Sequence, residues 1–432
     1  MPVWNDTDRR IWAIALPAIA TNVTVPLLGL ADTAITGHLG SAAYIGAVAV
    51  GGMMFNMMYW LLGFLRMATS GLTAQAHGSG TATRINAVRW QAMTYGLAAG
   101  MAIVLLQWPL LELMRLFFAP EGQVEQYASR YFLILVWGAP AVLATNSLCG
   151  WFLGMQDARS PMLTAIVQNV VNIALSLILV FVAGMKIEGV AIGTLVAQWS
   201  GLGIAIWRYC TCHSSKKPLL RLRIRGDGRF FRVSRDIFLR TLCLVAVMSW
   251  FTRTGTAFGE VTLAANTVLM QFFVITSYVF DGLANAAEAT GGSLYGARDT
   301  GGLRQVLRRL FLICIIVAVG FTLIFAIGGE AFISVLTDRP EVRQAANTFL
   351  PYLIAVPLLS FTAFLLDGVF IGCTRTRAML LSVAVSAMLF FGILAWFSPT
   401  LANHALWTAY IFYLFLRGLV LLAATPALLH SR

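Results

Sequence analysis

Long uninterrupted apolar stretches are the feature that most limits what this chain can fold into. Twelve of them follow one another along 432 residues. A helix needs about 20 apolar residues to cross roughly 30 Å of hydrocarbon, and only helices or closed barrels satisfy their backbone groups in lipid. Uninterrupted stretches lack the alternating pattern of barrel strands. The sequence therefore predicts an all-α polytopic membrane protein.

The composition supports this fold class and excludes several others. The chain is 59% apolar and only 11% charged, against roughly 25% charged residues in soluble domains. This excludes a soluble enzyme, a disordered chain and a secreted disulfide scaffold. The expected helices are about 11–36, 46–76, 88–117, 127–154, 160–184, 187–209, 236–259, 264–294, 304–330, 346–372, 377–397 and 403–428.

The basic residues predict the orientation in the membrane. If the N-terminus is cytoplasmic, cytoplasmic segments carry 21 of the 30 Lys and Arg residues, as the positive-inside rule requires. Both termini are then cytoplasmic. The same distribution explains the net charge of +12 without nucleic acid, and we expect no nucleic-acid partner.

Glycine motifs recur along the chain at a constant spacing. The segment GWFLG at 150–154 is matched by GVFIG at 368–372, and Gly78 by Gly296, each 218 positions later. This predicts two six-helix bundles with the same orientation, related by a pseudo-two-fold axis along the membrane normal, a plan used by transporters. The expected domains are 1–209, a basic cytoplasmic linker 210–235, and 236–432.

Four segments resemble one transporter family. They are LADTAITGHLG at 30–40, GLTAQAHG at 71–78, the stretch 281–299 with Asp281, Glu288 and Arg298, and LDG…GCTR at 366–375. They are similar to segments of the multidrug and toxic compound extrusion (MATE) family, in particular its DinF-like branch. The resemblance covers essentially the whole chain.

The resemblance implies a proton-coupled antiporter that exports organic cations, drugs or other toxic small molecules from the bacterial inner membrane. It implies that the coupling residue is Asp32. Family members carry an Asn and a following Asp in the fifth span, and the matching positions here are Asn172 and Ser176. The missing acid leaves the proton stoichiometry open. The glutamate used for sodium coupling in the seventh span has no counterpart here.

The residues themselves also single out Asp32. An ionisable residue within a membrane span is costly and is functional by default. Asp32 lies four residues from the outer end of its expected helix, with Thr21 and Thr36 on the same helical face. The alternative is a solvated aspartate at a helix end.

Two further polar groups are candidates. Gln168, Asn169, Asn172 and Ser176 share a helical face in the fifth span, which predicts either a substrate pocket or interhelical hydrogen bonds. Deeper charges predict ion pairs that gate the cytoplasmic side, or plain structural pairs. Those charges are Arg66, Asp281 and Asp367.

Other functions remain as alternatives. A flippase for lipids or lipid-linked precursors has a related architecture, but its cationic cavity does not fit these acidic candidates. A membrane-embedded enzyme would need a cluster of catalytic or metal-binding side chains, and the five His residues are scattered. We therefore expect no enzyme, no cofactor and no metal. The expected partners are membrane lipids, protons and hydrophobic or cationic small molecules, bound by a monomer.

Overall fold

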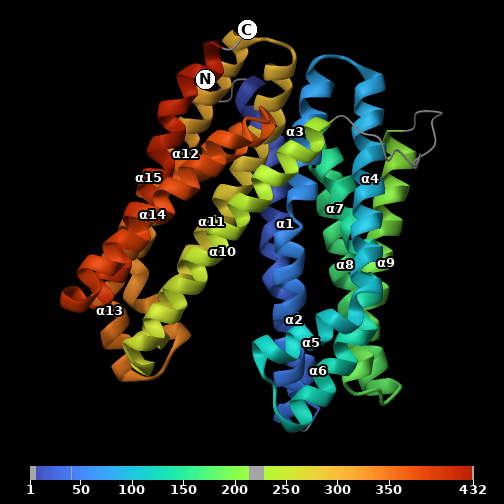
Figure 1. Ribbon diagram of the computed structural model, residues 1–432, viewed down its shortest axis with the longest axis vertical. Coiled ribbons are helices and arrows are strands. Elements are labelled where there is room, and N and C mark those ends of the chain that lie inside the picture. Colours follow the sequence, from blue (N-terminus) through green and yellow to red (C-terminus); the bar gives the residue numbers. More distant parts are fainter. Residues whose placement is uncertain (1–5, 40, 214–227, 431–432) are drawn as a thin grey trace. The chain divides into compact units, whose positions relative to one another are not determined.

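The computed structural model describes residues 6–39, 41–213 and 228–430. Every regular element in these ranges is helical (Figure 1), which confirms the predicted all-α class. The first half contains α1 (Asp6–Gly37), α2 (Ala42–Leu61), α3 (Phe64–Gly78), α4 (Ala82–Leu105), α5 (Gln107–Phe118), α6 (Gly122–Leu135), η1 (Val136–Gly138), α7 (Ala139–Gly154), α8 (Arg159–Leu177), η2 (Ile178–Val182) and α9 (Ile187–Cys212). The second half contains α10 (Gly228–Ala257), α11 (Glu260–Gly296), α12 (Thr300–Leu336), α13 (Pro340–Gly372), α14 (Thr376–Leu401) and α15 (Asn403–His430).

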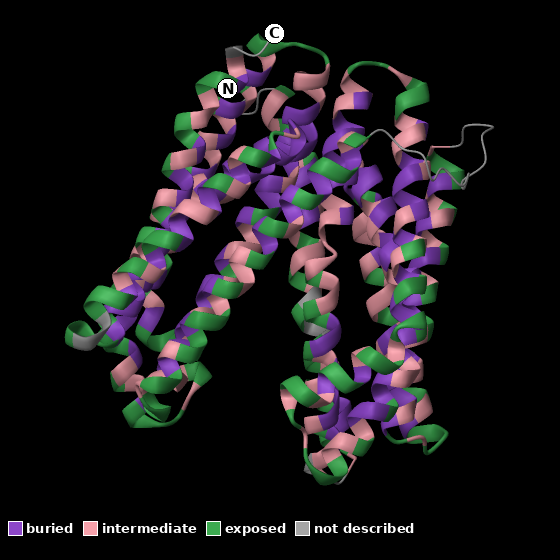
Figure 2. Cartoon of the chain, viewed as in Figure 1, coloured by how far each residue is buried: buried purple, intermediate pink, exposed green. Residues whose placement is uncertain are grey.

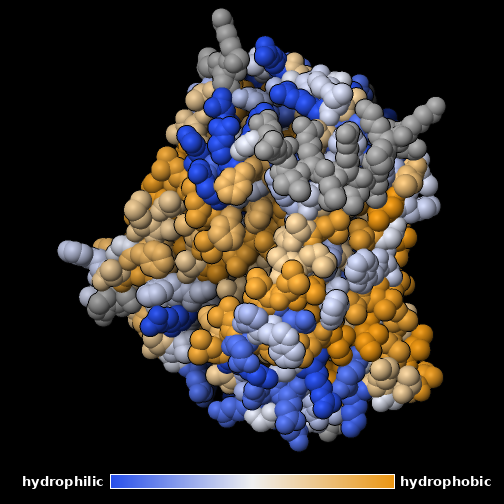
Figure 3. All heavy atoms as spheres, turned by 45° about the vertical axis from the view of Figure 1, so that its right-hand side comes forward, coloured by the Kyte–Doolittle hydropathy of each residue, from blue (hydrophilic) through white to orange (hydrophobic). Residues whose placement is uncertain are grey.

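The number of membrane spans agrees with the sequence prediction. Among the described residues, 11 helices are long and apolar enough to cross a membrane, and the count reaches 12 when the bent pair α4 and α5 is taken as one span. The axes of α4 and α5 differ by 69°. Figure 3 shows a broad hydrophobic middle on the face drawn, with hydrophilic residues towards its ends. This is the surface expected of a chain that lies in a bilayer.

The second span is interrupted rather than continuous. The expected helix 46–76 is divided into α2, which ends at Leu61, and α3, which begins at Phe64. The Gly63 N–H donates to the Trp60 carbonyl at 3.1 Å, which is a three-residue turn tighter than an α-helical one. Hydrophobic periodicity does not reveal such a break, because the residues on both sides remain apolar.

The duplicated glycines occupy equivalent positions in the two halves. A Cβ atom added at Gly150 would lie 2.3 Å from the Arg66 carbonyl oxygen, and one added at Gly368 would lie 2.2 Å from that of Ala284. Both the glycines and their neighbours are separated by 218 positions. Each glycine therefore allows two helices to approach closely, α7 to α3 and α13 to α11.

The helix ends repeat with the same offset. Gln156 and Thr374, which follow α7 and α13, have φ values of 64° and 52°. The next N–H groups, of Asp157 and Arg375, each donate to a carbonyl five residues back at 2.9 Å. This is a Schellman-type helix end. The internal duplication predicted from the sequence is thus repeated in detailed backbone geometry.

The chain forms two compact units, which we describe separately. One comprises residues 20–77 and 81–234, and the other comprises 1–19, 78–80 and 235–432. The first has a core that includes Trp151, Phe152 and Tyr209. The second has an aromatic core that includes Phe251, Trp407 and Tyr410. Figure 2 shows buried, intermediate and exposed residues alternating along most helices, and many of the exposed residues are large and apolar.

The predicted linker, 210–235, is described only in part. Its residues 214–227 lie outside the described residues. On either side of them, α9 extends to Cys212 and α10 already begins at Gly228.

Candidate functional site

Asp32 lies near the C-terminal end of α1 and is buried, with only 7% of its surface exposed. The Thr36 hydroxyl donates to the Asp32 carbonyl at 2.8 Å, so the neighbouring polar side chain is satisfied by the helix itself. The Asp32 Oδ1 atom has no hydrogen-bond partner among the described residues, and Asp32 forms none of their ion pairs. The central feature of the unit that comprises residues 20–77 and 81–234 is thus a buried carboxyl group that forms no ion pair with the described residues.

Polar side chains of three other helices belong to the same unit as Asp32. Tyr131 of α6 lies near both Asp32 and Thr194 of α9. The Asn172 amide of α8 donates to the same Thr194 hydroxyl at 2.8 Å. Thr194 donates in turn to the Val190 carbonyl at 2.9 Å. Asn172 and Thr194 are therefore joined by a hydrogen bond, and Tyr131 lies near both Thr194 and the Asp32 carboxyl group.

Asn172 and Ser176 are fully buried on α8. The Ser176 Oγ and Asn172 Oδ1 atoms have no hydrogen-bond partner among the described residues. Gly193 of α9 faces Ser176, since a Cβ there would lie 2.5 Å from the Ser176 Oγ atom. A buried polar atom without a partner costs about 1–3 kcal/mol, so each of these two atoms calls for a bound water or ligand.

The other members of the predicted polar face hold helices together. The Asn169 side chain donates to the Thr24 carbonyl at 3.1 Å, which joins α8 to α1. Gln168 packs against Gly201 of α9. The Thr21 carbonyl accepts a bond of 2.7 Å from the Thr24 hydroxyl. The face thus divides, with Asn172 and Ser176 buried in the unit and Gln168 and Asn169 half-buried at helix contacts.

Asp367 of α13 has a different environment. It is buried and forms ion pairs through the same oxygen, Oδ2, with Arg240 of α10 and Arg417 of α15. The sequence predicts a gating set of Arg66, Asp281 and Asp367, but the cations described beside Asp367 are Arg240 and Arg417. The backbone of Arg66 in α3 packs against Gly150 of α7. Asp281 is an exposed position of α11.

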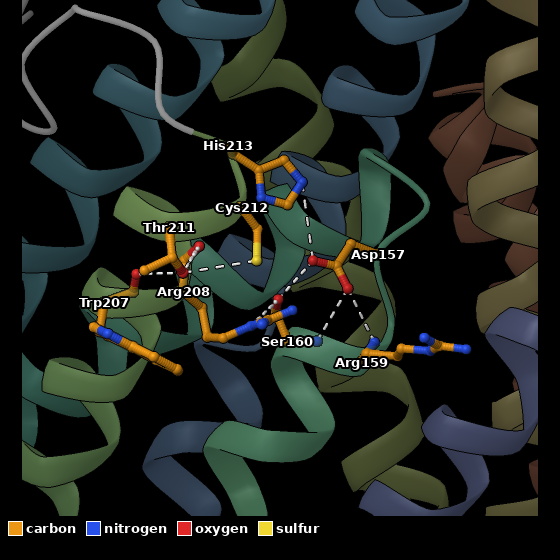
Figure 4. A network of polar contacts seen from close by, with 8 residues as sticks. All are labelled: Asp157, Arg159, Ser160, Trp207, Arg208, Thr211, Cys212 and His213. Carbon is orange, nitrogen blue, oxygen red and sulfur yellow. Dashed lines mark hydrogen bonds and ion pairs between the residues drawn. The ribbon is translucent and has the colours of Figure 1, made fainter.

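A second polar network surrounds His213, at the end of α9 (Figure 4). Its Nε2 atom lies 3.9 Å from Asp157 Oδ2, and its ring packs 5.2 Å from that of Trp151. Partial burial lowers the pKa of His213, an effect that Asp157 opposes. Asp157 also accepts bonds from the N–H groups of Arg159 and Ser160 at 3.1 Å, so it caps α8.

The described residues contain no group of three or more His, Cys, Asp or Glu side chains placed to hold a metal ion. Near His213, both Cys210 and Cys212 are exposed thiols. The structure of this part of the chain therefore gives no indication of a site for a metal cofactor.

Sequence reasoning missed several residues of these sites. Tyr131 and Thr194 are each one of several polar residues on their helices, and nothing in their spacing relates them to Asp32. Arg240 and Arg417 are visible as basic residues inside apolar stretches. That signal identifies both as functional or paired, but it does not name Asp367 as their common partner.

Comparison with known proteins shows what this chain resembles. The MatE family matches residues 17–178 and 236–397, which are the two repeats. The chain is 38% identical to DNA damage-inducible protein F of Escherichia coli strain K12, over 98% of this chain and 93% of the relative. It is 23% identical to a probable multidrug resistance protein NorM of Thermotoga maritima, over 78% and 74% of the two chains.

Solved structures with the same fold cover almost the whole chain. One is a MOP superfamily transporter from Pyrococcus furiosus, with a TM-score of 0.86 and 18% identity over 99% of this chain and 98% of that one. Another is an outward-facing multidrug resistance MATE family transporter, with a TM-score of 0.87, the same identity and the same coverage. These similarities confirm the predicted fold class of two bundles of membrane-spanning helices.

Proposed function

The chain belongs to the MatE family of multi-pass membrane transporters, and from this premise we propose that it is a proton-coupled antiporter. It is a transport protein and not an enzyme. In our proposal it exports hydrophobic or cationic small molecules by alternating access, and Asp32 is the group that takes up and releases the proton.

The observation that carries this proposal is that Asp32 is buried and forms no ion pair with the described residues. Keeping a carboxylate within the membrane costs about 2.5–3.5 kcal/mol on insertion scales. Either a proton or a positively charged substrate removes that cost. Because both occupants neutralise the same carboxylate, each favours release of the other, and this competition is the physical basis of exchange.

The group around Asp32 supports substrate binding nearby. Asn172 Oδ1 and Ser176 Oγ are buried without partners among the described residues, so they are available to a substrate or to water. Thr194 positions the Asn172 side chain through their shared hydrogen bond. We propose that Asn172 and Ser176 contact the substrate. The other polar residues hold the surrounding helices in position, and they are Thr21, Thr36, Gln168 and Asn169.

We also propose that one proton is exchanged for each monovalent cation. Ser176 stands where the resemblance implies a second acid, so Asp32 is the only carboxyl group of the proposed site. An exchange of one proton for one monovalent cation moves no net charge. The driving force for exchange is then the pH gradient alone, which supplies about 1.4 kcal/mol per proton for each pH unit. The exchange rate in proteoliposomes should therefore depend on the pH gradient and should not respond to an imposed potassium diffusion potential. A strong response would contradict this stoichiometry.

The proposal includes the arrangement in the membrane. We place the functional bundles at 1–209 and 236–432, with both termini in the cytoplasm of a bacterial inner membrane and the protein acting as a monomer. A reporter enzyme that is active only outside the cytoplasm can be fused to either terminus. Both fusions should be inactive, because both termini are cytoplasmic in this proposal.

The decisive experiment measures accumulation of a fluorescent organic cation by proteoliposomes, with and without a pH gradient. Wild-type protein should accumulate the dye only when the gradient is present, and Asp32→Asn should not. Asp338→Asn is the matched control, because Asp338 is a fully exposed acid and its replacement should leave accumulation unchanged. Accumulation by Asp32→Asn at the wild-type rate would overturn the assignment.

A further inference from the structure

A cavity of about 170 Å³ lies within the unit that comprises residues 20–77 and 81–234. It is formed where α3 ends and where α4 and α10 begin. Its lining contains two arginines, two glutamines and five apolar residues, with no acidic residue. The cavity is therefore amphipathic, with a positively charged part and an apolar part.

The charged part is held in place by contacts with the surrounding helices. Arg229 of α10 donates to the Gln75 side chain of α3 at 2.6 Å. Arg84, in the first turn of α4, is the second cation of the lining. Two guanidinium groups thus belong to one cavity although they come from helices that are far apart in the sequence.

The deeper polar wall is also ordered. Gln91 is buried, with 6% of its surface exposed, and its amide donates to the Tyr95 hydroxyl at 3.4 Å. The Tyr95 ring packs against Phe230, with centroids 5.2 Å apart. Phe230 follows Arg229 directly and lines the cavity, so this aromatic contact fixes the start of α10 and the arginine beside it.

These features select a type of ligand. Guanidinium groups bind phosphate oxygens through paired hydrogen bonds, and the lining that the described residues form contains two of them. The apolar wall of Leu72, Val88 and Phe230 fits a hydrocarbon portion attached to the phosphate. In the orientation proposed above the cavity lies at the cytoplasmic side, where basic pockets between helices are typical sites for anionic lipid headgroups.

We propose that this cavity binds a phosphate group, and that its source is the headgroup of an anionic phospholipid. Arg84 and Arg229 bind the phosphate oxygens, Gln91 supplies a further donor, and the apolar wall contacts the glycerol and the first methylene groups. The bound lipid would join α3, α4 and α10. The site is independent of Asp32, so this proposal does not depend on proton coupling.

The test uses the purified full chain in nanodiscs of phosphatidylcholine with a minor fraction of phosphatidylglycerol. After mild detergent extraction, native mass spectrometry counts the lipids retained by the protein. Wild-type protein should retain phosphatidylglycerol in preference to phosphatidylcholine. Each arginine near a membrane surface contributes about a fivefold preference, so Arg84→Gln and Arg229→Gln should each lower retention by roughly that factor.

The matched control is Arg253→Gln. Arg253 is an exposed arginine of the same helix as Arg229, stacked 4.9 Å from the Trp250 ring and away from the cavity. Its replacement should leave retention at the wild-type level. Equal retention by wild type, Arg84→Gln and Arg229→Gln, or an equal loss in Arg253→Gln, would overturn the proposal.

A second arm distinguishes the lipid from a soluble phosphate. Wild-type protein in a neutral detergent is heated with added inorganic phosphate or with the same ionic strength of chloride. If phosphate raises the melting temperature in wild type but not in Arg229→Gln, while phosphatidylglycerol is not retained, the site takes a soluble phosphate and the lipid assignment is wrong. Arg229→Lys keeps the charge but lacks the paired donors, so it should retain more lipid than Arg229→Gln and less than wild type.

Discussion

Asp32 and Asp367 are both buried acids of membrane-spanning helices, yet their surroundings are opposite. Asp32 in α1 lies near the Tyr131 hydroxyl and forms no ion pair with the described residues. Asp367 in α13 is bound by Arg240 and Arg417. Breaking a buried ion pair is expensive, so Asp367 is fixed as part of the second unit. An acid without a cation remains available for exchange, which is why we assign the coupling role to Asp32.

The largest expected effect tests the exchangeable member of this pair. Asp32→Asn should abolish substrate-driven proton release, measured with a trapped pH dye in proteoliposomes. Asn has nearly the same shape as Asp, and the Asp32 carboxyl oxygen Oδ1 has no described partner to lose. The melting temperature of the variant should therefore stay close to that of wild type. If the folded variant released protons normally, Asp32 would not be the coupling residue, and the proposed difference between Asp32 and Asp367 would be wrong.

The next largest effect concerns the fixed member. Asp367→Asn leaves two buried guanidinium groups without a carboxylate, and breaking such a pair costs about 3–5 kcal/mol. We expect a large fall in melting temperature in detergent. Arg240→Gln is the matched variant, because Arg417 still pairs with Asp367, and it should be less destabilising. If Asp367→Asn were as stable as wild type, Asp367 would belong with Asp32 as an exchangeable acid.

A third prediction tests how similar the two halves are where they repeat. Gly150→Ala and Gly368→Ala each place a Cβ atom less than 2.5 Å from a backbone oxygen of a neighbouring helix. Overpacking of this kind costs about 1–3 kcal/mol, and the two losses in melting temperature should be similar. Gly203→Ala and Gly392→Ala are the controls, because neither glycine has a neighbouring atom within 4 Å. Unequal losses would show that only one of the two contacts is tightly packed.

The smallest effect concerns a titratable group outside the spans. Burial lowers the pKa of His213, so the unfolded chain binds the proton at a higher pH than the folded chain does. Stability should therefore fall as the pH drops below about 6.5, the ordinary pKa of histidine. His213→Gln should show a smaller decrease in melting temperature between pH 7.5 and pH 5.5. An equal decrease in both proteins would assign the acid sensitivity to other groups.

The sequence was sufficient for the arrangement of spans because hydrophobic length reports lipid exposure directly. It was also sufficient for the repeat, because Gly150 and Gly368 are needed wherever two helix backbones approach closely. It failed at local breaks such as Gly63, where apolar residues continue across a change in backbone geometry. Helix α10 starts at Gly228, before the expected residue 236. Its first residues are basic, and hydropathy alone assigns them to a loop.

In the candidate sites, too, some residues could be predicted from the sequence and others could not. Asp32 is recognisable in the sequence, since an acid within an apolar stretch is rare and costly. Its neighbours Tyr131 and Thr194, and the pairing of Arg417 with Asp367, were not predictable. The two residues of that ion pair are 50 positions apart, and Arg240 and Asp367 are 127 apart. Contacts over such separations depend on which helix faces meet.

The amino-acid sequence by itself determined that this chain crosses the membrane about twelve times, repeats itself once and carries rare acids within its spans. The spans and the rare acids follow from the cost of placing each residue in lipid, which is a property of one helix at a time, and the repeat follows from the spacing of glycines along the chain. Only the tertiary structure decided which acid is neutralised by arginines and which is not. That decision requires helices from distant parts of the chain to pack together, because a charge is compensated only by groups that lie within a few ångströms of it.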